Sequence, residues 1–151
     1  MRTFDDFALG EELEFGQAAF ELDEMIAFAE RWDPQLFHTD PEAAATSPFG
    51  GIVASGWQTL AAVGRRLTDL IVAEQWANLG GTGMNGIRLV APVRPGDVLT
   101  IRGAVVGLEP SQSGKPRGRL DFRVDFDNQD GTHVGEMTLS LLLARPIASG
   151  S

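Results

Sequence analysis

The sequence predicts an α+β protein in which an antiparallel sheet curves around one long helix. Apolar residues recur at a helical period from Trp57 to Ile71, which indicates a long amphipathic helix. From Met84 to Ala144, segments with strand character are separated by tight turns. A stretch rich in Pro and Gly, Asp33 to Gly51, precedes the long helix. Early helices followed by hairpin-connected strands are typical of the α+β class, with the long helix available to fill the concave face of the sheet.

Length and composition suit one globular domain, which we expect to span residues 1–151. Hydrophobic residues make up 43% of the chain and charged residues 22%, and both values are ordinary for globular proteins. The absence of cysteine excludes disulfides and thiolate chemistry, and two histidines are too few for a His-rich metal site. Carboxylates could still hold Mg²⁺ or Ca²⁺, but we assign no residue to a metal. A formal net charge of -9 argues against a nucleic-acid partner. The chain has no apolar run long enough for a membrane span and no secretory signal, so we expect a cytoplasmic protein.

The first elements are a strand and a helix. Residues 11–20 read as a strand, and Asp23 is a good N-cap for the helix that follows. The expected apolar face of this helix has four members: Met25, Ile26, Ala29 and Trp32. Pro34 ends the helix, because the residue before a proline avoids the helical region. A short helix is expected after Asp40, which can cap it with a proline in the first position.

The long helix is expected from Gly56 to Glu74. Ser55 can cap it through its hydroxyl, and Gln58 completes a Ser-x-x-Gln capping box. Gly64 lies on the apolar stripe, which suggests the close approach of another backbone, such as a sheet. The N–H of Gly56 stays free at the positive end of the helix dipole, where it could stabilise a carbonyl oxygen acquiring negative charge. The alternative for this stretch is an ordinary capped core helix.

The remainder of the chain is expected to form strands. They are Met84–Val90, Val98–Val106, Arg119–Asp127 and Thr132–Ala144. The third alternates cleanly between apolar and charged residues, as a strand with one buried face does. A turn rich in Pro and Gly, Pro92–Asp97, precedes the second of these strands, and a hairpin turn, Asn128–Gly131, precedes the last.

Asp33 and His38 are the residues best suited to chemistry. They stand five positions apart in irregular chain just after a helix, so an acid and an imidazole could converge on one water molecule. In the alternative interpretation, Asp33 ends the helix and His38 is an ordinary loop histidine. The second histidine, His133, follows a hairpin turn and is expected to be exposed.

Two basic segments could bind anionic groups. One is the run from Lys115 to Arg119, and the other is Arg94 in a turn. A solvated loop is the alternative for each. No phosphate loop of the Walker or dinucleotide type and no nucleophile-elbow motif is present.

Three motifs in a fixed order carry a resemblance to a known family. The run from Phe28 to Ala43 contains Asp33-Pro-Gln-x-Phe-His38, the run from Phe49 to Leu60 opens the long helix, and Pro92 to Asp97 comes later. Together they closely resemble the MaoC-like dehydratases, relatives of the R-specific enoyl-CoA hydratases. The resemblance covers the chain from about Phe4 to Arg145 and implies the hot-dog fold.

The match to the hydratase signature, Asp-x-Asn-Pro-aliphatic-His, is partial. Asp33 and His38 fill its first and last positions. Gln35, Leu36 and Phe37 replace the amide, the proline and the aliphatic residue. The two acid–base residues are therefore retained, while the interior of the motif differs from that of the hydratases.

The resemblance implies a lyase of fatty acid metabolism. Asp33 and His38 would activate one water for addition to C3 of a trans-2-enoyl thioester and would protonate C2 on the same face. The product would be a 3-hydroxyacyl thioester of R configuration, and the reverse reaction would be a dehydration. The Gly56 N–H would hold the thioester carbonyl as it becomes enolate-like.

Further residues are expected at the substrate. Three lie next to these in the sequence: Gln35, Ser55 and Trp57. Basic residues are expected at the nucleotide end of the thioester: Arg94, Lys115 and Arg117. The resemblance implies no cofactor, because CoA is part of the substrate.

The resemblance also implies partners and leaves alternatives. The substrate would be an acyl-CoA or an acyl-carrier thioester, and the protein would be a homodimer or a higher homo-oligomer, because edge strands need pairing or covering. A hot-dog acyl-CoA thioesterase also needs a carboxylate near a helix N-terminus, although it gives no reason for His38. A non-catalytic subunit that binds acyl thioesters is the third possibility.

Overall fold

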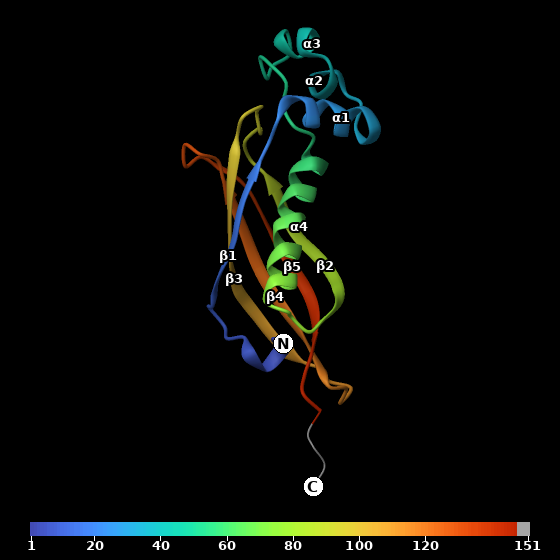
Figure 1. The fold of residues 1–151 in the computed structure, drawn as a ribbon, viewed down its shortest axis with the longest axis vertical. Helices are drawn as coiled ribbons and strands as arrows, with labels where there is room; N and C mark the ends of the chain where they lie inside the picture. Colours follow the sequence, from blue (N-terminus) through green and yellow to red (C-terminus); the bar gives the residue numbers. More distant parts are fainter. Residues whose placement is uncertain (148–151) are drawn as a thin grey trace.

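Five strands form one antiparallel sheet in the order β1-β3-β4-β5-β2 in the computed structural model, which describes residues 1–147 (Figure 1). The strands are β1 Glu12–Ala19, β2 Asn78–Leu89, β3 Val98–Pro110, β4 Arg117–Asp127 and β5 His133–Ala144. β3, β4 and β5 follow one another as hairpins, whereas β1 and β2 form the two edges. The predicted α+β class and antiparallel sheet are confirmed.

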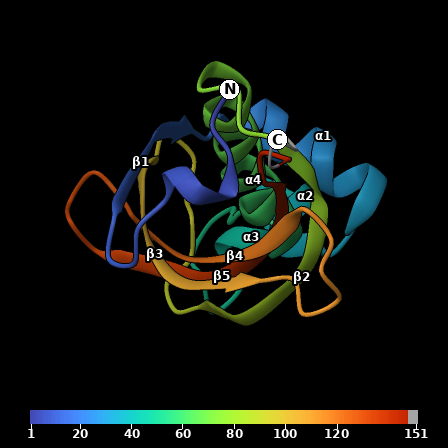
Figure 2. The ribbon, with the colours of Figure 1, turned by 90° about the horizontal axis from the view of Figure 1, so that it is seen from below.

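The long helix α4, Gly56–Ala73, lies in the hollow of the curved sheet (Figure 2). Its buried face includes Val63 and Leu67, while β4 contributes Phe122 and Phe126, which are fully buried. Replacing such a core phenylalanine by alanine costs about 3–5 kcal/mol, so this layer accounts for much of the stability of the fold. The prediction of a sheet wrapped around this helix is therefore confirmed.

Short helices gather at one end of α4 (Figure 1). They are α1 Leu22–Trp32, α2 Leu36–Thr39 and α3 Pro41–Ala45, and a 3-10 turn, Phe4–Asp6, lies near the N-terminus. Asp40 caps α3 as predicted, because its carboxylate accepts hydrogen bonds from the N–H groups of Glu42 and Ala43. Asp23 is not the N-cap of α1, since the helix begins earlier, after Glu21. α2 was not predicted, because four residues are too few to show a helical period.

Of the expectations for the helices, the cap at Ser55 is confirmed and three others need correction. Ser55 caps α4 as predicted, with its Oγ 3.2 Å from the Trp57 nitrogen. The capping box is wrong, because the side-chain oxygen of Gln58 is buried without a partner in the described residues. A Cβ on Gly64 would meet no atom within 4 Å, so no sheet approaches there. Trp32 and Trp57 were assigned to apolar faces, but both side chains are exposed.

The edge strand β2 is longer than predicted. It begins at Asn78 rather than at Met84, because the intervening glycine-rich segment carries no alternating pattern. Its pairing with β5 shifts register at three places, including one between Gly81 and Gly83. Most of β2 is exposed, including the apolar side chains of Leu79 and Met84. Because β2 is an edge strand, the main-chain groups along its outer edge have no strand partner within one chain.

The helices of the described residues include none that could cross a membrane. The expected domain of residues 1–151 extends beyond the described part of the chain by residues 148–151. We therefore describe the fold for residues 1–147 alone.

Candidate active site

Asp33 occupies the C-cap of α1, with its N–H bonded to the Ala29 carbonyl at 2.8 Å. Each carboxylate oxygen accepts one hydrogen bond from a neighbouring side chain. Gln35 Nε2 donates to Oδ1 at 2.8 Å, and Ser55 Oγ donates to Oδ2 at 2.8 Å. The hydroxyl that caps α4 therefore also fixes the carboxylate at the end of α1, which ties the two helices together at this point.

His38 lies in α2 with 8% of its side chain exposed. Its Nδ1 is 2.6 Å from the Val53 carbonyl oxygen, and the ring packs edge-on against Phe37 at 4.6 Å between centroids. The Val53 N–H donates to the Phe37 carbonyl at 3.2 Å, so main-chain bonds join α2 to the segment before α4. Both the position and the orientation of the imidazole are fixed.

The sequence prediction that Asp33 and His38 converge agrees with their placement. His38 Nε2 is 3.4 Å from Asp33 Oδ2, and the Asp33 side chain is 17% exposed. The hydrogen bond from Gln35, followed by that from Ser55, lowers the pKa of the Asp33 carboxyl from its ordinary value, against the opposing effect of burial. Asp33 is therefore held as a carboxylate next to the imidazole.

Gly56 begins α4 beside these two residues. Within residues 1–147 its N–H has no hydrogen-bond acceptor, as the capping pattern predicts. A Cβ at this position would lie 2.7 Å from Leu89 Cδ1, because the end of β2 passes close to the start of α4. Glycine is thus favoured here for packing as well as for access to the N–H.

The remaining predicted substrate residues lie in different places. Trp57 lines an apolar hollow beside the site, and the Arg94 guanidinium lies near Gly51, in the segment that leads to Ser55. Lys115 lies in the β3–β4 turn and Arg117 begins β4, and this turn lies at the opposite end of the sheet from the short helices (Figure 1). The structure therefore does not bring Lys115 and Arg117 to the Asp33–His38 pair of the same chain.

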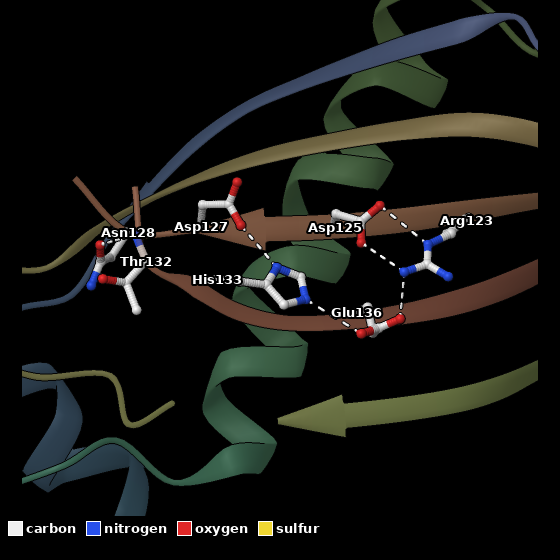
Figure 3. A network of polar contacts seen from close by, with 7 residues as sticks. All are labelled: Arg123, Asp125, Asp127, Asn128, Thr132, His133 and Glu136. Carbon is white, nitrogen blue, oxygen red and sulfur yellow. Dashed lines mark hydrogen bonds and ion pairs between the residues drawn. The ribbon is translucent and has the colours of Figure 1, made fainter. Parts of the chain in front are cut away.

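His133 forms a second polar cluster, on the strands rather than at the helices (Figure 3). Its Nδ1 is 2.9 Å from Asp127 Oδ1, its Nε2 is 3.3 Å from Glu136 Oε1, and Arg123 bridges Glu136 and Asp125. The hydrogen bond to Asp127, together with Glu136, raises the pKa of His133 above its ordinary value. The expectation that His133 is simply exposed is incomplete, because its two ring nitrogens are engaged.

Some site features had no signal in the sequence. The acceptor for His38 is the main-chain carbonyl of Val53, which no residue pattern marks. Leu89 reaches Gly56 only through the fold. Within residues 1–147, no group of three or more His, Asp or Glu side chains is arranged so that it could hold a metal ion.

Comparisons with known proteins identify the family. The model of the MaoC like domain matches residues 6–121. The MaoC-like dehydratase from Rhodospirillum rubrum is 34% identical with a TM-score of 0.87, over 97% of this chain and 99% of that one. The 3-hydroxyacyl-thioester dehydratase Z of Mycobacterium tuberculosis is 30% identical over 84% of this chain and 89% of its own length.

A third comparison concerns the fold alone. The R-hydratase PhaJ1 of Pseudomonas aeruginosa shares 22% identity and a TM-score of 0.67, over 98% of this chain and 96% of that one. The structure thus has the hot-dog fold that the motifs implied, with the helix in the hollow of the sheet. With a family model that covers most of its length and a dehydratase relative at 30% identity, the chain belongs to the MaoC-like dehydratase family.

Proposed function

We propose that the protein adds water reversibly to trans-2-enoyl thioesters and gives (R)-3-hydroxyacyl thioesters, with Asp33 and His38 as the acid–base pair. The observation that carries this proposal is the arrangement of the imidazole between a main-chain carbonyl and a carboxylate. Nδ1 lies 2.6 Å from the Val53 oxygen, and Nε2 lies 3.4 Å from Asp33 Oδ2. The name of the dehydratase relative supports the same class of reaction.

The hydrogen positions follow from these partners. A carbonyl oxygen can only accept, so Nδ1 of His38 carries the hydrogen. In the neutral ring Nε2 then has a free lone pair, and it faces a carboxylate oxygen that also accepts. Two acceptors at 3.4 Å do not bond to one another. A water molecule beside the pair, within hydrogen-bond distance of both atoms, can donate one hydrogen to each, which would hold it in place as a nucleophile.

The proposed reaction uses this water in both directions. Its oxygen bonds to C3 of the enoyl thioester as the pair accepts its proton, and the π electrons move to the thioester as an enolate. The same pair then returns a proton to C2, so water adds across one face. The Gly56 N–H, at the start of an 18-residue helix, is aimed to stabilise the enolate oxygen.

The test is an assay with two readouts. Purified protein is mixed with crotonyl-CoA, while the absorbance of the enoyl thioester and the release of free thiol are followed together. Loss of the absorbance without thiol is the expected result. Thiol release would replace the proposal with a thioesterase, and no change in either signal over a panel of enoyl thioesters would favour a non-catalytic binding subunit.

We further propose that the protein is a homodimer at least. The outer edge of β2 presents unpaired main-chain groups and exposed apolar residues such as Leu79 and Met84. Native proteins rarely leave such an edge uncovered, since it pairs with other strands. Light scattering across micromolar concentrations should give at least twice the chain mass. A monomer at all concentrations would contradict this assembly.

The nucleotide end of the substrate is expected to meet basic residues. Arg94 lies near Gly51, in the segment that leads to Ser55, whereas the β3–β4 turn with Lys115 lies at the opposite end of the sheet of the same chain. Antiparallel pairing of two β2 edges would reverse the second chain and place its β3–β4 turn at this end. Arg94→Ala should then raise KM and weaken its salt dependence, and Lys115→Ala/Arg117→Ala should do so in the dimer only. An unchanged KM in both variants would direct the search to another surface.

A further inference from the structure

Two of the three tryptophans of the chain are exposed, and both adjoin the candidate site. Trp32 precedes Asp33 and is 62% exposed, and Trp57 follows Gly56 and is 67% exposed. The third, Trp76, is 6% exposed and belongs to the core. Exposed indoles are uncommon on surfaces without a ligand or a partner, because each leaves a large apolar area in water. Their position next to Asp33 and Gly56 in the chain indicates a role in binding.

The two indoles belong to one apolar hollow. Phe28 and Trp32 from α1 and Trp57 from α4 line a space of about 350 Å³. The Arg31 guanidinium lies 4.8 Å from the Trp32 ring centroid. Arg31 takes part in no ion pair within residues 1–147, whereas other arginines do, as in Arg65–Asp69. The hollow therefore has aromatic walls, and a cation without a carboxylate partner in the described residues lies against the Trp32 ring, in a chain of net charge -9.

The burial of the Asp33 and His38 side chains determines which part of the substrate would reach this hollow. The side chains of His38 and Asp33 are 8% and 17% exposed, so carbons C2 and C3 must enter the interior of the protein. In the proposed reaction the thioester carbonyl meets the N–H of Gly56, which directly precedes Trp57 in the chain. The sulfur and the chain attached to it must then leave toward solvent, where the exposed Trp32 and Trp57 side chains lie.

We propose that this hollow binds the pantetheine arm of an acyl-CoA substrate, and that Arg31 contacts the phosphate at the end of the arm. The inference rests on the proposed function and adds to it the site that binds the arm of the thioester. Methylene and amide groups of the arm pack well on aromatic rings, and a guanidinium stacked on an indole is suited to bind a phosphate. An acyl carrier protein presents the same phosphopantetheine arm, so free CoA and crotonyl-CoA are the probes of this site.

The first experiment compares two substrates that differ in the arm. Crotonyl-CoA carries the whole arm and its phosphate, and crotonyl-N-acetylcysteamine lacks most of it. Trp32→Ala and Trp57→Ala should each lower kcat/KM for the CoA thioester by about tenfold, the equivalent of roughly 1.4 kcal/mol, and leave the shorter thioester almost unchanged. Trp32→Phe and Trp57→Phe should keep most of the activity, because they retain an aromatic ring. Leu9→Ala, which removes an exposed apolar side chain elsewhere, is the matched control.

The proposed contact between Arg31 and the phosphate is tested by the effect of salt on KM. Arg31→Gln should raise KM for crotonyl-CoA and reduce its dependence on ionic strength, because an exposed charge pair is screened by salt. It should not change KM for the N-acetylcysteamine thioester, which has no phosphate. Equal effects of Arg31→Gln on both substrates would remove the phosphate contact from the proposal.

The second experiment measures binding without turnover. Free CoA, titrated into the full-length protein, should change the tryptophan fluorescence of the wild type and of Asp33→Asn alike. In Trp32→Phe/Trp57→Phe only the buried Trp76 remains, so the signal should be lost while equilibrium dialysis still detects CoA. Trp32→Ala/Trp57→Ala should weaken CoA binding in dialysis by at least about tenfold.

Three outcomes would overturn the inference. CoA affinity that is unchanged in Trp32→Ala/Trp57→Ala would show that the arm lies elsewhere. Equal losses for both thioesters would mean that the indoles support the reaction centre itself. Conversion of a dimer to a monomer with intact CoA binding would assign the indoles to a second copy of the chain. Failure of the proposed function would give a different result. The wild type would then bind CoA with a fluorescence change but would hydrate neither thioester.

Discussion

The chain has two histidines, and each lies beside an aspartate in a different setting. His38 is buried among short helices, with Nδ1 on the Val53 carbonyl and Nε2 3.4 Å from Asp33. His133 is 40% exposed on the strands, with carboxylates 2.9 and 3.3 Å from its two nitrogens. The first ring has one nitrogen free to accept a proton, whereas the second has both nitrogens engaged with acceptors.

The comparison shows that an Asp–His contact does not by itself define an acid–base pair. A carbonyl on one nitrogen fixes the hydrogen there and keeps the other nitrogen basic. Carboxylates on both nitrogens favour the charged ring, which cannot act as a base. The group that contacts the other ring nitrogen therefore decides which role an Asp–His contact suits. A main-chain carbonyl suits catalysis, and a second carboxylate suits stability.

The largest expected effect tests this contrast directly. Asp33→Asn and His38→Ala should each lower kcat by about 10²- to 10⁴-fold, as acid–base groups typically do. The double variant should be little worse than either single one, because the two residues act on one water. The measurement is a double-mutant cycle in kcat with melting temperatures beside it. Full activity in folded Asp33→Asn would remove the pair from the mechanism.

A smaller effect is expected from the hydrogen bonds to Asp33. The donors Gln35 and Ser55 lower its carboxyl pKa, so their removal should raise it. If the reaction needs Asp33 ionised, the acid limb of kcat/KM should move to higher pH in Gln35→Leu and in Ser55→Ala. Ser55→Ala should also lower stability by about 1 kcal/mol, because it removes the cap of α4. An acid limb unchanged in both variants would contradict the role of these bonds.

Gly56 provides a third test, which concerns the main chain rather than a titrating group. A Cβ there would lie 2.7 Å from Leu89 Cδ1, so Gly56→Ala must displace the leucine or the start of α4. We expect a loss of stability of about 1 kcal/mol, the low end for overpacking, and a fall in kcat. Gly56→Ala/Leu89→Ala should recover activity if the contact is the cause. No recovery would point to the N–H geometry itself.

The smallest effect is expected at His133. Because its folded pKa is raised, its interactions stabilise the protein fully below the unfolded value of about 6.5 and lose this effect as the pH rises through the folded pKa. His133→Ala should therefore lower the free energy of unfolding at pH 5.5 by less than about 1 kcal/mol and have no effect at pH 9. Its kcat should equal that of the wild type. A large loss of kcat in this variant would undo the distinction between the two histidines.

The sequence predicted those parts of the fold in which burial imposes a regular pattern. In β4 the residues Leu120, Phe122, Val124 and Phe126 alternate with charged ones and are all fully buried. The start of β2 escaped prediction, because an edge strand exposed on both faces imposes no such pattern. Periodicity also misplaced Trp32 and Trp57, since a helical stripe does not distinguish residues that meet the core from residues that meet a ligand or solvent.

The site was predictable where side chains carry the chemistry. Asp33, His38 and the capping hydroxyl of Ser55 are marked by residue type and spacing. The Val53 carbonyl is not marked in this way, because every residue has a carbonyl. Its contact with His38 depends on how α2 packs against the segment that precedes α4. The bond from Ser55 to Asp33 joins residues 22 positions apart, so it also required the fold.

The sheet topology also bears on how the chain folds as it is synthesised. β2 leaves the ribosome before β3, β4 and β5, yet its one neighbour in the sheet is β5, with Asn78 opposite Leu143. The β3–β4–β5 meander can form from local hairpins, whereas β2 must wait until β5 has been synthesised. Until β5 is synthesised, β2 has no neighbouring strand, and the apolar side chains of α4 are not fully covered by the sheet. We therefore expect a nascent chain that ends before β5 to recruit chaperones, and vectorial folding to end with the closure of this strand.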